Sequence, residues 1–221
     1  MSGQRSSVRL SELLSGDPVD VAPRLLGKIL AAGPPGEETS GRIVEVEAYR
    51  GEDDPASHAF RGPTARNRTM FGRPGLLYVY LSYGMHYCCN IVCWPEGRAG
   101  AVLVRALRPL GGLEQMRSRR LRARRDVDLC SGPGKVCQAL GIDRAADGTD
   151  LLSPGSGVRL VDDRSGSVEG IVVAGPRVGV AAHLLTAGEL WRFSVRGDEN
   201  VSRSGSASGA SSAGADPVVQ P

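Results

Sequence analysis

Residues 43–47 read Ile-Val-Glu-Val-Glu, an alternation of apolar and polar side chains. A period of two predicts a half-buried β-strand, with one face on the core and the other in solvent. Glu47 stands near the end of this predicted strand, two residues before Tyr49 and ahead of a polar loop that carries His58. A carboxylate in this place is a candidate general base, because it can accept a proton from a nearby water. The alternative is a solvated glutamate on an edge strand.

The length of 221 residues fits one domain with a well-formed core, and the hydrophobic content of 41% fits a soluble protein. No apolar run reaches the roughly 18 residues that a membrane-spanning helix needs. The first seven residues are not followed by the apolar stretch of a secretory leader. We therefore expect a cytoplasmic protein.

The net charge of +3 is carried almost entirely by arginine. Of the 27 basic residues only Lys28 and Lys135 are lysines, so 25 are arginines. Arginine suits phosphate because its planar fork donates two parallel hydrogen bonds. A genome-wide preference for arginine codons explains the same count, so the composition favours an anionic partner only weakly.

Five cysteines are odd in number and contain no CxxC pair. His86 lies close to three of them in the sequence. On a β-strand, however, the side chain of Cys88 would point to the opposite face from those of Cys89 and Cys93. Buried free thiols in a reducing compartment are therefore expected, and no metal site. The five are Cys88, Cys89, Cys93, Cys130 and Cys137.

The pattern along the chain predicts a loose N-terminal arm over residues 1–20, one folded domain over residues 21–203 and a tail over residues 204–221. The tail contains mostly Ser, Gly and Ala, so it is expected to be disordered. Short strands and two helices are expected inside the domain. The strands are at residues 101–104, 158–161, 171–174 and 191–195, and the helices at residues 113–127 and 130–140, the second stopping at Gly141.

Residues 76–93 contain two β-rich runs on either side of a short turn with a glycine, which predicts a β-hairpin. The turn carries Tyr83 and Met85, where small polar residues are usual. An exposed aromatic side chain at such a tip can wedge between stacked bases. Packing under a neighbouring loop is the alternative.

Basic side chains gather in three segments that can contact phosphate. The loop over residues 50–75 contains Arg61, Arg66, Arg68 and Arg73, and it is too long and basic for a simple connection. Lys135 follows the start of a predicted helix, whose free N–H groups also favour phosphate. The third segment is the arginine run from Arg117 to Arg125, for which a solvated helical face is the usual explanation.

Taken together, the ordered segments resemble the alkyladenine (3-methyladenine) DNA glycosylase family, the type found in mammals and many bacteria. The resemblance spans roughly residues 21–202 and does not include the tail. The matching segments are residues 41–49, 56–58, 64–71, 75–80, 83–85, 90–91, 103–107, 130–133 and 177–180.

The resemblance assigns catalytic roles to Glu47 and Arg105. The acid matching Glu47 takes a proton from the water that attacks the anomeric carbon of a flipped nucleotide. Its charge suits a transition state like an oxocarbenium ion. The arginine matching Arg105 helps to hold this water and the adjacent phosphate. An arginine beside the acid is also expected to keep it ionised.

The resemblance also implies how the base is recognised. Tyr49, His58 and Tyr80 match residues that sandwich the extruded base, and stacking of this kind tolerates several lesions. Asn90 matches a residue whose side chain crowds the amino group of guanine, which excludes the normal base. Tyr83 matches the residue inserted into the duplex. Taken singly, each of these side chains also has an ordinary structural explanation.

We therefore expect a single mixed α/β (α+β) domain with a curved, mainly antiparallel sheet, flanking helices and a protruding β-hairpin. The expected enzyme is a monomeric, monofunctional DNA glycosylase that needs no cofactor and acts on duplex DNA containing damaged purines. A lyase step would need an amine nucleophile, and neither lysine belongs to the Glu47 group. Hypoxanthine, ethenoadenine and 3- and 7-methylpurines are not ranked. The alternatives are a non-catalytic nucleic-acid binding module and a hydrolase of free nucleosides.

Overall fold

The strand β2 (Thr39–Tyr49) organises the sheet, because it pairs with three other strands. Along one edge it pairs with β5 (Ala101–Gly111) over nearly its whole length. Along the other edge, its first residues pair with β1 (Ile29–Ala32), and residues 45–47 pair with β8 (Arg192–Val195). The sheet therefore branches at β2, and Glu47 lies on the branch shared with β8. The computed structural model describes residues 9–34, 36–163, 170–185 and 188–202.

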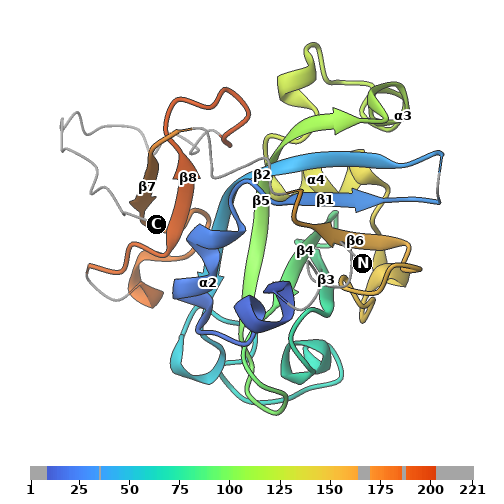
Figure 1. The fold of residues 1–221 in the computed structure, drawn as a ribbon. Helices are drawn as coiled ribbons and strands as arrows, with labels where there is room; N and C mark the ends of the chain where they lie inside the picture. Colours follow the sequence, from blue (N-terminus) through green and yellow to red (C-terminus); the bar gives the residue numbers. More distant parts are fainter. Residues whose placement is uncertain (1–8, 35, 164–169, 186–187, 203–221) are drawn as a thin grey trace, which may run out of the picture.

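The described strands form one eight-stranded antiparallel sheet with the main order β3-β4-β5-β2-β1-β6. β7 pairs only with β8, and Figure 1 shows this pair apart from β3 and β4. The predicted mixed α+β class with a mainly antiparallel sheet is confirmed. The remaining elements are α2 (Pro18–Leu25), β3 (Leu77–Ser82), β4 (His86–Val92), α3 (Leu113–Arg119), α4 (Pro133–Leu140), β6 (Val158–Val161) and β7 (Val172–Gly175), with short 3₁₀ turns between them.

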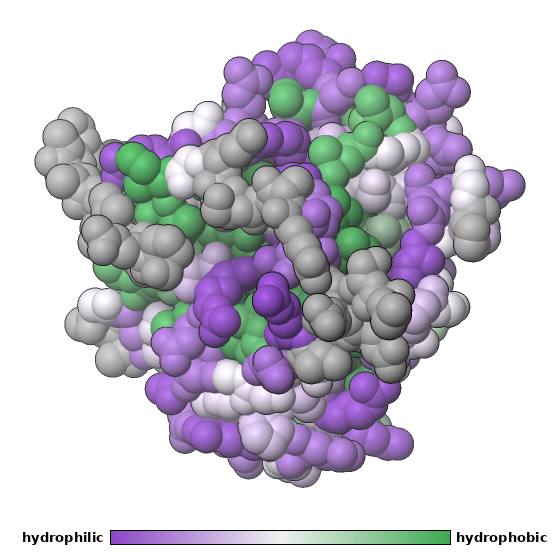
Figure 2. Space-filling model, in the orientation of Figure 1, coloured by the Kyte–Doolittle hydropathy of each residue, from purple (hydrophilic) through white to green (hydrophobic). Residues whose placement is uncertain are grey.

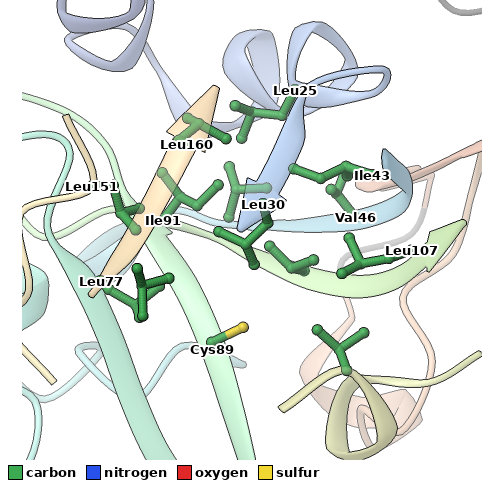
Figure 3. Packing of buried hydrophobic residues seen from close by; sticks show 14 of the residues in the cluster. Leu25, Leu30, Ile43, Val46, Leu77, Cys89, Ile91, Leu107, Leu151 and Leu160 are labelled. Atoms are coloured by element: carbon green, nitrogen blue, oxygen red, sulfur yellow. The ribbon is translucent and has the colours of Figure 1, made fainter. Parts of the chain in front are cut away.

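A continuous apolar core fills the space between the sheet and the helices. Side chains from α2, β1, β2, β4, β5 and β6 point toward one another within it (Figure 3). All five cysteines are buried and free, as predicted, and Cys89 lies in this core. On the face shown in Figure 2, charged and polar residues cover most of the surface, with smaller apolar areas between them. No helix in the described ranges has the length and apolar character to cross a membrane.

The prediction that β2 is half-buried was wrong, because residues 43–48 are all buried. The register with β5 shifts on both sides of Glu45, which marks a β-bulge. As a result, Ile43 and Val46 lie in the same main core although they are three residues apart, while Val44 packs in a separate small cluster. A bulge re-aims the side chains that follow it. Glu47 is thereby buried under the segments after β7 and β8 instead of facing solvent.

Three other boundaries differ from the sequence predictions. Within the arm expected at residues 1–20, a predicted short helix over residues 8–14 agrees with the helical residues 9–14, whose leucines are buried, but α2 already begins at Pro18, capped by Asp17. The strand expected at residues 101–104 is β5, which runs on to Gly111. The helix expected at residues 113–127 ends at Arg119, because the Arg120 backbone turns away and its guanidinium bonds the Leu129 carbonyl and Gln138.

Other predicted elements are observed. β6, β7 and β8 occupy the predicted strand positions within one residue, and α4 stops at Gly141. Gly141 has φ 71°, a left-handed conformation that glycine adopts without a steric penalty. The predicted tail at residues 204–221 lies outside the described residues.

Candidate active site

A cavity of about 620 Å³ opens where β2, β3, β4 and β5 meet the segment that follows β7. Its walls are aromatic and polar, as expected of a site for a planar base. Ten residues are predicted to act in catalysis, in base binding or in contact with DNA, and the tertiary structure brings all of them except Glu47, Arg68 and Lys135 to these walls. The seven are Tyr49, His58, Arg66, Tyr80, Tyr83, Asn90 and Arg105.

Glu47 lies directly behind this wall, and its side chain is fully buried. The Val178 N–H donates to its Oε1 atom at 2.7 Å, and Arg105 Nη1 lies 3.1 Å from the same oxygen. Its second oxygen accepts a hydrogen bond from the Tyr49 hydroxyl at 3.0 Å. Through Oε1, Glu47 therefore contacts two residues that line the cavity, and through Oε2 it contacts a third.

Burial raises the pKa of Glu47 above its ordinary value. The positive charge of Arg105 is the largest opposing influence, followed by the hydrogen bonds from the Val178 N–H and the Tyr49 hydroxyl. The expectation that an adjacent arginine favours the ionised acid is therefore correct in sign, but the loss of solvent outweighs it. The result is a carboxylate that binds a proton more readily than a solvated glutamate.

Arg105 joins two carboxylates inside the protein. Its Nε donates to Glu45 at 3.0 Å, its Nη1 contacts Glu47, and its Nη2 donates to the Ser202 hydroxyl at 3.2 Å. Arg192, opposite Glu47 on β8, donates to Glu45 at 3.1 Å. Two guanidinium groups therefore balance two buried carboxylates, which is the condition for keeping such charges in the interior.

Tyr49 is supported from behind by Arg177. The buried guanidinium of Arg177 lies 4.8 Å from the centre of the Tyr49 ring and 4.9 Å from that of Trp191. It pairs with the buried Asp54 through two nitrogens, at 2.5 and 2.9 Å, and donates to the Ala48 carbonyl. Cation–π contacts with two rings and a bidentate ion pair leave the guanidinium little freedom. The ring of Tyr49 is thereby fixed at the cavity wall.

His58 and Tyr80 form one wall together. Their ring centres are 4.5 Å apart in an edge-to-face contact, and Tyr78 stacks behind Tyr80 at 5.6 Å. His58 Nδ1 is 3.1 Å from the Tyr78 hydroxyl, and burial lowers the pKa of His58, so its neutral form is favoured. Two rings in contact leave no space between them for a base. A base in the cavity would therefore face this pair as a unit.

Asn90 is buried on β4, opposite Tyr78, and its side-chain amide donates to the Tyr78 carbonyl at 3.1 Å. This hydrogen bond fixes the amide against the cavity. Cys88 also lines the cavity, but burial raises the pKa of its thiol to about 11, so it is not a nucleophile at neutral pH. Among the described residues, no group of three or more histidine, cysteine or acidic side chains is placed to hold a metal ion.

Tyr83 stands at the rim, in the three-residue turn between the paired strands β3 and β4. Its side chain is 84% exposed, and its backbone has φ 49°, which is uncommon for a residue other than glycine. Met85 is exposed in the same turn. Arg66 is also exposed, with its guanidinium 6.0 Å from the Tyr80 ring centre. The exposed turn and Arg66 therefore border the mouth of the cavity.

Two predicted phosphate contacts are not part of the cavity wall. Arg68 is exposed on a 3₁₀ turn, and Lys135 is half-buried on α4, where it donates to Ser131. Within the run from Arg117 to Arg125, Arg117 pairs with Asp126 and Arg125 pairs with Asp128. The charges of these two arginines are therefore balanced locally.

The sequence predictions missed the residues that support the site. Glu45, Arg192 and Arg177 were given no role, and the Val178 N–H was not considered. Glu45 is two residues before Glu47 on the same strand, so the spacing alone places the two acids near each other. Arg177 and Val178 were noted only as part of a matching segment. Their contact with Glu47 and Tyr49 depends on chain segments that are far apart in the sequence.

Comparison with known proteins identifies the family of the chain. The family model described as Methylpurine-DNA glycosylase (MPG) matches residues 12–199. A Burkholderia lata protein named "Putative 3-methyladenine DNA glycosylase" is 52% identical over 183 residues, 83% of this chain and 85% of its own. A Streptomyces avermitilis protein of the same name is 47% identical over 184 residues, with the same coverage of both chains. The chain therefore belongs to the methylpurine-DNA glycosylase family.

Proposed function

We propose that this protein is a monofunctional DNA glycosylase of base excision repair. It flips an alkylated or deaminated purine out of duplex DNA and hydrolyses the N-glycosidic bond, leaving an abasic site. The observation that carries this proposal is the buried Glu47 carboxylate, held by Arg105 and the Val178 N–H beside an aromatic cavity. Membership of the family supports it.

In the proposed reaction, the extruded purine stacks between Tyr49 and the wall made by His58 and Tyr80. A water at the cavity side of Glu47 attacks the anomeric carbon and transfers one proton to this carboxylate. The bond between sugar and purine breaks, and its electron pair leaves with the base. The negative charge of Glu47 stabilises the positive charge that develops on the sugar. For this step the Tyr49 hydroxyl has to release the second oxygen of Glu47.

The proposal is tested with duplex oligonucleotides that each carry one hypoxanthine, ethenoadenine or 7-methylguanine. We expect strand scission only after hot alkali, because a glycosylase leaves an abasic site and no nick. Scission without alkali would contradict the monofunctional mechanism. Neither Lys28, which pairs with Asp162, nor Lys135 lines the cavity, which supports the absence of a lyase step. Intact duplex binding with no cleavage of any lesion would instead indicate a binding module.

Salt separates the proposed enzyme from a hydrolase of free nucleosides. Duplex binding through phosphates releases counterions, so excision under subsaturating conditions is expected to fall steeply as salt rises. The measurement is kcat/KM against salt concentration, with a free deaminated nucleoside as the second substrate. Hydrolysis of the nucleoside that does not depend on salt would favour the rival.

The acid limb of the pH profile is expected above the ordinary glutamate range. Glu47 must be ionised to accept a proton, so the rate falls as pH falls through its pKa. Because burial raises this pKa, the fall begins at a higher pH than for a solvated glutamate. Single-turnover excision against pH measures the limb. A rate that stays constant down to the ordinary glutamate pKa would contradict this role of Glu47.

Replacing Tyr83 by alanine is expected to weaken excision without weakening the fold. Loss of one aromatic stacking partner costs about 1–3 kcal/mol, or roughly 5- to 150-fold in excision efficiency. The free energy of unfolding should change by less than about 0.5 kcal/mol, because the side chain is exposed. Leu121→Ala is the control, since Leu121 is 87% exposed but does not line the cavity. Equal effects of the two variants would exclude a specific role for Tyr83.

A further inference from the structure

Glu45 is a buried carboxylate that the proposed reaction does not use. Its side chain has no exposed surface, and it does not line the cavity. It nevertheless receives three hydrogen bonds, two on Oε1 from Arg105 and Arg192, and one on Oε2 from the Ser202 N–H at 2.7 Å. A carboxylate with this many partners is held in one position. It can act on the reaction by holding Arg105 and by the negative charge that it places near Glu47.

The contact that matters is the one between Glu45 and the Nε edge of Arg105. Guanidinium groups bind carboxylates most strongly through two parallel N–H groups. Arg105 uses its Nε for Glu45 and its Nη2 for Ser202, so a single nitrogen, Nη1, reaches Glu47. The contact of Arg105 with Glu47 is to Oε1, whereas the Oε2 atom accepts a hydrogen bond from the Tyr49 hydroxyl. One lone pair of the base is therefore kept clear of the cation.

We propose that Glu45 is a positioning residue for the reaction: it holds Arg105 so that one oxygen of Glu47 stays available to the attacking water. Arg192 and Ser202 hold Glu45 in turn, from β8 and from the segment that follows it. This inference rests on the proposed function for its effect on excision. Its effect on the Glu47 carboxyl does not require activity.

Removal of the Glu45 charge changes the surroundings of Glu47 in a known direction. The groups that face Glu47 are Glu45 and Tyr49 from β2, Arg105 from β5, Arg192 at the paired position of β8 and the Val178 N–H. In Glu45→Gln a repelling negative charge is lost, and Arg105 is free to close on Glu47 with a second nitrogen. Both changes lower the pKa of Glu47 and make it a weaker base.

The test compares wild type with Glu45→Gln in the full-length protein. We expect a fall of at least about tenfold in single-turnover excision, while the Kd for a duplex with an uncleavable lesion analogue stays within about twofold. The acid limb of the rate profile should move to lower pH by about one unit. Titration of the Glu47 carboxyl by ¹³C NMR should show the same displacement. In a Glu47→Gln background, Glu45→Gln should have no further effect on the rate.

Asp198→Asn is the matched control. Asp198 is also a buried carboxylate, and it also pairs with an arginine of β5, Arg108, but outside the site. Its substitution should leave the acid limb and the Glu47 titration unchanged. If Glu45→Gln does not fold, Glu45→Asp is the second variant. It keeps the negative charge on a shorter side chain, so it should lower the excision rate and leave the pH of the acid limb unchanged.

The outcomes separate the two proposals. Wild type that releases no base overturns the proposed function, while a lowered Glu47 titration in Glu45→Gln still supports the positioning geometry. An active Glu45→Gln with wild-type rate and titration overturns the positioning role alone. A slower Glu45→Gln whose Glu47 titration is unchanged shows a merely structural role and overturns it as well.

Discussion

Replacing Glu47 by glutamine is expected to slow single-turnover excision by about 100- to 10,000-fold, the usual contribution of a general base. Glutamine has nearly the same shape: its carbonyl oxygen can accept from the Val178 N–H, and its amide N–H can donate to the oxygen of the Tyr49 hydroxyl. It cannot take a proton from water, and it provides no charge to stabilise the sugar cation. Binding of a lesion duplex should therefore persist. Parallel measurements of the single-turnover rate and of duplex Kd check this expectation.

Glu52→Gln provides the control for this substitution. Glu52 is an exposed glutamate on the 3₁₀ turn directly after β2, so the same chemical change is made five residues from Glu47. It should excise at the wild-type rate. A Glu47→Gln protein that excises normally would remove Glu47 from the reaction and favour another base. One that neither binds nor unfolds cooperatively would show instead that the buried carboxylate is needed for folding.

Replacing Asp54 by alanine is expected to destabilise the protein by about 3–5 kcal/mol. The substitution removes the bidentate carboxylate partner of the buried Arg177 guanidinium and leaves it only the longer contact with Glu189, at 3.5 Å, among its carboxylate contacts in the described residues. Asp54 also accepts from the N–H groups of Arg50 and Ala56, which order the loop that leads to His58. Chemical denaturation followed by tryptophan fluorescence measures the loss. Excision should fall too, because both Tyr49 and His58 lose support.

The adjacent residue gives an unusually close comparison. Asp53 also pairs with an arginine, Arg98, at 3.2 Å, but its side chain is 60% exposed. Water and salt screen such pairs, so Asp53→Ala should change the free energy of unfolding by at most about 1 kcal/mol. Similar losses in the two variants would mean that the burial of the Arg177–Asp54 pair is not what stabilises this region.

Local sequence patterns predicted much of the scaffold, and the family resemblance pointed to several of the residues that line the cavity. The short strands were located by β-rich runs between turn residues, and the end of α4 by Gly141, whose left-handed backbone any other residue adopts less easily. Exposure of Tyr83 followed from finding an aromatic residue in a tight turn. The family was recognised from the order of many short segments, which is confirmed by the match over residues 12–199.

The failures have a common cause, because each depends on a partner that is distant in the sequence. The bulge at Glu45 exists only in the pairing of β2 with β5, and it changes which side chains enter the core. The early end of α3 depends on the carbonyl and amide groups that Arg120 meets on neighbouring segments. Neither partner is visible in the local pattern of apolar and polar residues.

The short motifs of the sequence, through the family that they resemble, therefore established the fold class, the family and the choice of Glu47 as the candidate base. Only the tertiary structure decided the electrostatic state of that acid. Its protonation depends on burial and on contacts with Arg105 and with Val178, which is 131 residues away in the chain. Glu45, which shares Arg105 with it, is itself held by Ser202 across 157 residues. Charge interactions of this kind depend on distance and solvent exclusion, and a linear pattern contains neither.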